Sequence, residues 1–123
     1  SFNERKFMTT TMEKGLRLAG TVEFAGLEAP PTWGRADKLL THASQVFREV
    51  DTSDAERWMG QRPATPDSLP VISGSPHHAR VFYAFGHGHL GLTGGAVTGR
   101  HIAALVAGRD PEIDLTPFRV DRY

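Results

Sequence analysis

The sequence has 123 residues, enough for a hydrophobic core of its own, and 39% of them are hydrophobic. Lys and Arg total 14, as do Asp and Glu, so the chain has no net charge and lacks the basic surface expected of a nucleic-acid-binding protein. Because it has no cysteine, a disulfide scaffold, a zinc ribbon and a thiol nucleophile are all excluded.

The most apolar stretch runs from Leu92 to Ala107 and includes Arg100 and His101. It is too short and too polar to cross a bilayer, which takes about 20 apolar residues. Residues 1–6 lack the apolar core of a signal peptide and lead into a strand-like segment. We therefore expect a cytoplasmic protein.

The first predicted elements are two β-strands, residues 5–12 and 16–24, joined by a short turn that ends in Gly15. Apolar and polar residues alternate along the second strand from Leu16 onward, a spacing that places the apolar side chains on one face. The pattern predicts a hairpin with one apolar face.

An amphipathic helix is predicted for residues 33–48, with the hydroxyl of Thr32 as its N-cap. A short strand over residues 57–62 would follow and end at Pro63. Residues 63–79 hold four of the eight prolines of the chain, which predicts a loop restrained by proline.

Residues 80–85 form a short β-branched and aromatic run that predicts a buried strand. A glycine-rich segment and a helix over residues 91–107 come next, and Gly108 ends that helix. The tail, residues 110–123, is predicted to be irregular. The fold class is therefore α+β: an antiparallel sheet with a covering helix, followed by a strand–loop–helix unit.

The strand–helix junction matches the pattern G-x-G-x-x-G through Gly86, Gly88 and Gly91. A dinucleotide-binding fold also needs a second strand that ends in an acidic residue about 20 positions on. Asp110 or Glu112 lies at about that distance, but an irregular tail stands where the strand should be. The full dinucleotide-binding interpretation is therefore rejected, and a loop open to close approach by a ligand remains.

The glycines of this loop could also serve a purely structural role. They could relieve crowding at a tight turn, an alternative as good as ligand contact on physical grounds. His87 and His89 would need a third ligand to bind a metal, and no other histidine has a spacing that supplies one, so no metal site is expected. Either histidine could act as a base, but an ordinary polar loop residue is the simpler interpretation.

Three segments resemble flavin-dependent D-amino acid dehydrogenases and their glycine-oxidase relatives. Residues 58–72 (WMGQRPATPDSLPVI) are similar to a proline-rich block of that family, and residues 81–93 (VFYAFGHGHLGLT) resemble its closing strand and flavin loop. Residues 12–24 (MEKGLRLAGTVEF) resemble the dehydrogenase branch. The residues that follow the helix, from Gly108 to Arg122, fit as well.

The resemblance implies that this chain is the C-terminal part of a longer flavoenzyme whose N-terminal half holds the ADP part of FAD. Residues 1–79 would belong to the substrate domain and residues 80–123 to the FAD-binding domain. The intact protein would transfer a hydride from the Cα of a D-amino acid to FAD N5, giving a 2-oxo acid and ammonia. Electrons would leave through a quinone or another carrier, and the intact protein could be peripheral to the inner membrane, whereas the fragment alone would be inactive.

The resemblance also suggests site residues. Arg62 would bind the substrate carboxylate through its planar guanidinium, with Trp58 beside the substrate. The loop would contact the flavin, where the dipole of the following helix stabilises charge near N1; its residues are Gly86, His87, Gly88, His89, Leu90, Gly91, Leu92 and Thr93.

Simpler roles compete with these. Arg62 could form a surface ion pair with Asp67, Trp58 could be a core residue, and Arg17 could pair with Glu23 across one face of the hairpin. For the whole chain, the alternatives are a fragment of a glycine- or sarcosine-oxidase-like enzyme and a non-catalytic binding or structural module. The oligomeric state does not follow from the sequence.

Overall fold

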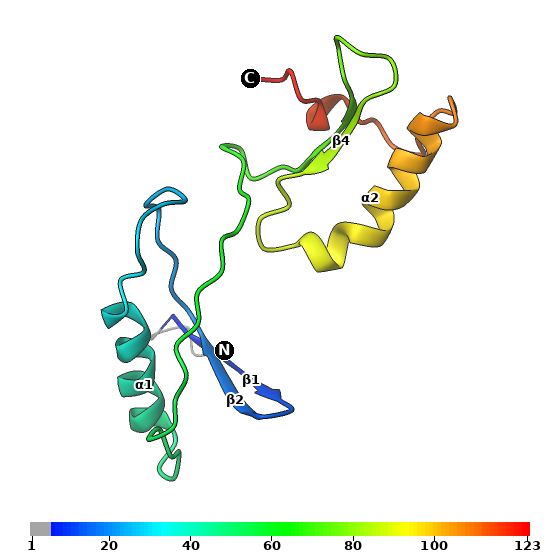
Figure 1. Ribbon diagram of the computed structural model, residues 1–123. Coiled ribbons are helices and arrows are strands. Elements are labelled where there is room, and N and C mark those ends of the chain that lie inside the picture. Colours follow the sequence, from blue (N-terminus) through cyan, green and yellow to red (C-terminus); the bar gives the residue numbers. More distant parts are fainter. Residues whose placement is uncertain (1–5) are drawn as a thin grey trace. The chain divides into compact units, whose positions relative to one another are not determined.

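The computed structural model describes residues 6–123 (Figure 1), and the chain divides into two compact units, residues 1–60 and residues 61–123. Each unit pairs one antiparallel two-stranded sheet with one helix, so the α+β class is confirmed. The boundary between these compact units lies before the proline-rich segment. The assignment of segments to a substrate domain and a FAD-binding domain stays a prediction.

In the first unit, β1 (Met8–Met12) pairs with β2 (Gly15–Ala19), so the predicted hairpin is confirmed. Its second strand is shorter than expected, because residues 20–24 leave the sheet and Phe24 is 92% exposed. The predicted start of the first strand, residue 5, lies outside the described residues.

Helix α1 (Gly34–Val46) contacts β2 and confirms the predicted amphipathic helix. Buried Phe7 stacks on His42 of this helix with ring centroids 6.1 Å apart, and Ala43 is fully buried. The predicted cap is wrong: no side chain among residues 6–123 caps α1, and Thr32 instead donates its backbone N–H to Glu23 Oε1 at 3.0 Å. The carbonyl oxygen of Thr32 accepts the N–H of Arg35.

In the second unit, β3 (Val71–Gly74) pairs with β4 (Phe82–Phe85). Strand β3 lies inside the segment that we expected to be a loop, so that prediction is wrong. The predicted strand at residues 57–62 is wrong as well, because those residues are extended coil and exposed. Pro70 lies directly before β3 and therefore removes none of its ladder hydrogen bonds.

Helix α2 (Gly91–Val106) packs on both β3 and β4 (Figure 1). The core of this unit contains Val71 and Ile72 from the sheet and His101 from the helix. The tail is irregular except for η1 (Thr116–Phe118), a single 3-10 turn that contacts β3. No strand follows α2 in residues 107–123, which agrees with the rejection of a dinucleotide-binding unit.

No helix within residues 6–123 is long and apolar enough to cross a membrane.

Candidate functional site

The glycine loop, residues 86–90, joins β4 to α2 and depends on two glycines in the left-handed region. Gly86 has φ 78° and Gly88 has φ 52°, values that residues with a Cβ adopt only at a cost. A Cβ on Gly86 would lie 2.6 Å from Thr65 Cγ2, whereas a Cβ on Gly88 would meet nothing within 4 Å. Gly86 is therefore packed inward, and the position of Gly88 opens onto free space.

The N-terminus of α2 is uncapped. No side chain of the described residues caps its first turn, and the first N–H groups of a helix have no acceptor within the helix itself. These groups, with the positive end of the helix dipole, favour an incoming carbonyl or anionic oxygen. The flanking side chains, Leu90 at 62% and Leu92 at 99% exposure, leave this end of the helix uncovered within the described unit.

The ring of His87 ties the loop to helix α2. Its Nε2 lies 2.8 Å from Oγ1 of Thr98, a residue of α2 that is only 8% exposed. A Cβ on Gly94 would be 3.6 Å from the His87 ring, so the imidazole lies along the helix. His87 is therefore held as a structural side chain, and His89, in contrast, is exposed.

A second segment runs beside the glycine loop. Gly88 donates its N–H to the carbonyl oxygen of Pro63 at 2.9 Å, and Ala64 forms a β-bridge with His87. Arg62 directly precedes this contact and is exposed. The structure thus brings the predicted carboxylate-binding residue next to the predicted flavin loop, two features that the sequence separates by a strand and a loop.

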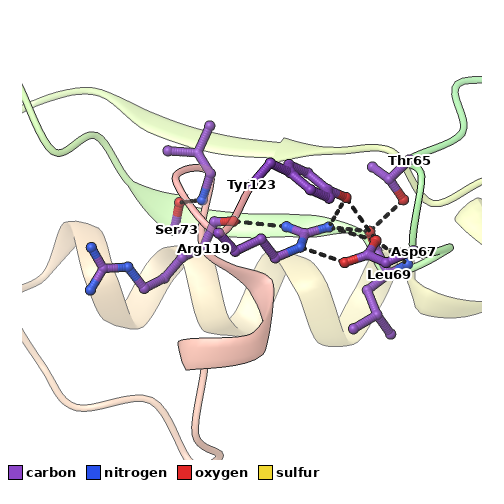
Figure 2. A network of polar contacts seen from close by, with 8 residues as sticks. Thr65, Asp67, Leu69, Ser73, Arg119 and Tyr123 are labelled. Atoms are coloured by element: carbon purple, nitrogen blue, oxygen red, sulfur yellow. Dashed lines mark hydrogen bonds and ion pairs between the residues drawn. The ribbon is translucent and has the colours of Figure 1, made fainter.

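The alternative partner of Arg62 is contradicted. Asp67 binds Arg122 instead, with Nε to Oδ2 at 2.7 Å and Nη2 to Oδ1 at 3.0 Å. Tyr123 donates its hydroxyl to the same Oδ1 at 2.7 Å (Figure 2). Hydrogen bonds from Arg122 hold the pKa of Asp67 well below its usual range. Among residues 6–123, Arg62 forms no ion pair.

Trp58 belongs to the first unit and is not a core residue, because 73% of it is exposed. The guanidinium carbon of Arg17 lies 4.9 Å from the centroid of its ring, a cation–π contact. The expected pairing of Arg17 with Glu23 is therefore wrong. Glu23 lies instead 3.8 Å from Nε of Arg35.

Several residues that shape the loop were not identified from the sequence. Thr65 packs against Gly86, Thr98 binds His87, and Arg122 closes the Asp67 network. For Thr98 the sequence held one signal: it lies three positions before His101, so helical spacing places both residues on one face of α2. For Arg122 the sequence held no local signal, because its partner lies 55 positions away.

Within the part of the chain that the structure describes, no group of three or more His, Cys, Asp or Glu side chains is placed to hold a metal ion.

The sequence pattern of the family described as FAD dependent oxidoreductase matches residues 1–105. The chain belongs to this family. The match covers both compact units up to the end region of α2, so the family resemblance of the sequence is confirmed.

Curated relatives agree with the family. The chain is 46% identical to a protein of Bradyrhizobium diazoefficiens named D-amino-acid oxidase, over 98% of the chain and 30% of that relative. It is 36% identical to a D-amino acid dehydrogenase of Paramagnetospirillum magneticum, over 98% of the chain and 29% of the relative. A D-amino acid dehydrogenase of B. diazoefficiens is also 36% identical. The chain thus spans about 30% of the length of these relatives.

The glycine loop fits part of a flavin. Open space at Gly88 allows a planar group to approach the backbone, and the uncapped start of α2 offers N–H groups to carbonyl oxygens of such a group. The described residues do not supply the strand–turn–helix and following strand that bind a pyrophosphate. The residues present therefore fit the ring end of FAD and not its ADP end.

Proposed function

We propose that the protein containing this chain is a FAD-dependent oxidoreductase that oxidises D-amino acids to 2-oxo acids and ammonia. Family membership and the names of the relatives support the reaction class. The observation that supports the assignment of residues is the hydrogen bond from Gly88 to Pro63, which joins the residue after Arg62 to the loop that precedes the uncapped start of α2.

Bound FAD would supply the oxidising power, by accepting the hydride that leaves the substrate Cα. The proposed role of this chain is to hold the oxygen-bearing edge of the flavin ring at residues 86–93. There the N–H groups at the start of α2 and its dipole would favour negative charge on a bound, reduced flavin. His87 contributes through its backbone, because its ring is bound to Thr98.

Arg62 is proposed to bind the substrate carboxylate. An arginine can donate two parallel hydrogen bonds to a carboxylate, which fixes the orientation of the substrate as well as its position. Arg62 is exposed and has no ion-pair partner within residues 6–123. It lies in coil at the start of the second unit. With the carboxylate fixed by Arg62, one enantiomer would direct its Cα–H bond toward bound FAD, and this would provide selectivity for D-amino acids.

The proton chemistry needs no base from this chain. Loss of the hydride from Cα of a neutral amine, together with one proton from nitrogen, gives an imino acid that water hydrolyses to the 2-oxo acid and ammonia. Neither His87 nor His89 is assigned a catalytic role.

As a separate proposal, Trp58 contacts the substrate. The residue is 73% exposed, and its ring lies against Arg17 and close to the backbone of Gly60. An exposed ring held in one orientation provides an apolar surface for an amino-acid side chain. Replacing Trp58 with Ala should then change the preference among D-amino acids more than the rate with any one of them.

The 123-residue chain alone is proposed to be inactive, because it fits only one end of FAD and spans about 30% of its relatives. Titration of the isolated chain with FAD should show weak binding or none. Micromolar affinity with a retained visible spectrum would contradict this proposal.

The test of the function uses the whole flavin-loaded protein under anaerobic conditions. Addition of D-amino acids should bleach the flavin absorption, the matching L-amino acids should not, and ammonia should form in step with the bleaching. If only glycine or sarcosine bleached the flavin, the proposed substrate class would be wrong.

The electron acceptor is proposed to be a quinone or another carrier, with the protein at the inner membrane. Residues 12–24 favour this dehydrogenase branch, whereas one relative is named an oxidase. Reoxidation in air decides between them: rapid formation of hydrogen peroxide would overturn the dehydrogenase assignment, and slow reoxidation that a soluble quinone accelerates would support it.

A further inference from the structure

The side chain of Arg122 is largely withdrawn from solvent, with 11% of it exposed. Its guanidinium meets the Asp67 carboxylate through two atoms, Nε and Nη2, in the bidentate arrangement that is strong and direction-specific. The guanidinium also donates to backbone: Nη2 lies 2.7 Å from the carbonyl oxygen of Leu69 and Nη1 lies 2.8 Å from that of Arg119. Nη2 lies 2.8 Å from the hydroxyl of Tyr123 as well. One guanidinium thus joins the tail to the segment of residues 63–70.

The same segment is tied at further points (Figure 2). The N–H of Leu69 is bound by Asp67 Oδ1 at 3.0 Å, and Thr65 Oγ1 donates to the carbonyl oxygen of Leu69 at 2.7 Å. The tail is in turn fixed to the sheet, because Val120 donates its N–H to Oγ of Ser73, a buried residue of β3. The segment is therefore anchored to the core of its unit by way of Arg122.

From this anchor a continuous set of contacts leads to the glycine loop. Thr65, held through Leu69, packs its methyl group against Gly86. Two residues earlier, the carbonyl oxygen of Pro63 accepts the N–H of Gly88. Arg62 stands at the end of this set and has no side-chain ion pair of its own among residues 6–123. Its position relative to the loop depends on the segment that Arg122 holds.

We propose that Arg122 is a positioning residue for Arg62: it locks residues 63–70 so that Arg62 stands at a fixed place beside the glycine loop. The inference rests on the proposed carboxylate-binding role of Arg62. Arg122 does not touch the substrate and acts only through the segment. Its network differs from an ordinary surface pair, which joins two exposed side chains and contributes little.

Arg119 provides the matched control. It is an arginine of the same tail, and its side chain pairs with Asp121, two residues on, with both side chains considerably exposed. Unlike the side chain of Arg122, its side chain forms no hydrogen bond or ion pair with residues 63–70. Arg119→Ala keeps the carbonyl oxygen that Arg122 uses, because that oxygen belongs to the backbone.

The experiment uses the whole flavin-loaded protein and measures KM for a D-amino acid. It also measures the Kd of acetate, a carboxylate that is not oxidised, from changes in the flavin spectrum. A displacement of about 1 Å at a reacting group can reduce efficiency by roughly 100-fold, so Arg122→Ala should raise both constants at least about tenfold. Flavin content should stay within about twofold, and Arg119→Ala should leave both constants unchanged.

A double-mutant cycle separates positioning from general stability. If Arg122 acts through Arg62, Arg122→Ala should have no further effect on KM or on the Kd of acetate in an Arg62→Ala background. An effect of equal size in both backgrounds, or no effect in either, would overturn the positioning role while leaving the function of Arg62 intact. Unchanged constants in Arg62→Ala alone would overturn the carboxylate-binding role and the positioning role with it.

Tyr123→Phe serves if Arg122→Ala does not fold. It removes the hydroxyl that donates to Asp67 Oδ1 and accepts from Arg122 Nη2, and it leaves the ion pair in place. The expected result is a smaller rise of KM and of the acetate Kd, again absent in the Arg62→Ala background. A Tyr123→Phe protein with the same constants as the parent would contradict the proposal.

Discussion

The N–H of Gly88 donates a 2.9 Å hydrogen bond to the carbonyl oxygen of Pro63. This bond has two consequences, because each partner adjoins a residue with a proposed role. On one side it helps to hold the loop in the left-handed conformation that leaves the start of α2 open. On the other side it brings the backbone of Pro63, the residue after Arg62, against the glycine loop. The two segments with proposed roles, the glycine loop and the residues that follow Arg62, therefore meet at one backbone contact.

Arg62→Lys should raise KM strongly and leave flavin content unchanged. Lysine keeps the charge but cannot donate two parallel hydrogen bonds to a carboxylate. Loss of one charge-assisted hydrogen bond costs about 1.5–3 kcal/mol, which corresponds to roughly a 10- to 150-fold rise in KM. Steady-state kinetics of the whole protein, with the flavin absorption spectrum as a measure of loading, tests this directly.

Arg80→Lys is the matched control for that measurement. Arg80 is an exposed arginine of the same unit, in the connection between β3 and β4. The Arg80→Lys replacement should leave KM for the D-amino acid unchanged. Equal KM values for Arg62→Lys and the parent protein would remove the carboxylate-binding role of Arg62.

Gly86→Ala should destabilise the protein more than Gly88→Ala. Both replacements place a Cβ at positive φ, which costs on the order of 1–2 kcal/mol. At Gly86 the new Cβ also lies 2.6 Å from Thr65 Cγ2, whereas at Gly88 it meets no atom within 4 Å. Urea unfolding should therefore show the larger loss for Gly86→Ala, and flavin affinity should fall for Gly88→Ala, whose Cβ enters the proposed ligand space.

A second replacement tests the cause of the Gly86 effect. Thr65→Ser removes the crowding methyl group but keeps the hydroxyl that binds the Leu69 carbonyl. Combined with Gly86→Ala, it should restore part of the lost stability. If the double variant were no more stable than Gly86→Ala alone, contact with Thr65 would not be the source of the loss.

The sequence predicted most of the fold because the periodic elements carry local signals. Alternation identified the β1–β2 hairpin, and helical spacing identified α1 and α2. Strand β3 was not predicted, because it has only four residues and lies between Pro70 and Pro76, in a stretch whose composition is typical of a loop. What defines this strand is its pairing with β4, a tertiary contact that no local pattern encodes.

The candidate site shows the same difference between local patterns, which the sequence reveals, and tertiary contacts, which it does not. The glycine loop was predicted from its spacing and its place between a strand and a helix. The partner of Asp67 was not, because the nearest arginine in sequence is Arg62 whereas the structure selects Arg122. Choosing between the two requires knowing that the tail returns to β3, where Val120 binds Ser73. Long-range ion pairs depend on topology and not on spacing.

Asp67→Asn should lower stability at neutral pH and make less difference in acid. Hydrogen bonds from Arg122 lower the pKa of Asp67 in the folded state below its ordinary value of 3.8. A lowered carboxyl pKa stabilises the folded state above the unfolded pKa, and this contribution is lost as the pH falls through the folded pKa. The stability difference between parent and variant should thus be constant above about pH 5 and shrink below about pH 4.

Urea titrations at several pH values measure this difference. In an Arg122→Met background, the main cause of the lowered pKa is gone, so the acid-dependent part of the difference should largely disappear. Persistence of the same pH dependence without Arg122 would show that another group controls Asp67.

Thr98→Val should loosen the glycine loop without changing its sequence. The replacement keeps the shape of a side chain that is 8% exposed but removes the oxygen that lies 2.8 Å from His87 Nε2. A part-buried nitrogen left without its partner costs about 1–3 kcal/mol. Thr98→Ser, which keeps the hydroxyl, should lose less. Amide exchange should quicken at residues 86–90 in the valine variant only. Equal exchange rates in both variants would mean that backbone bonds such as the one between Gly88 and Pro63 hold the loop without help from His87.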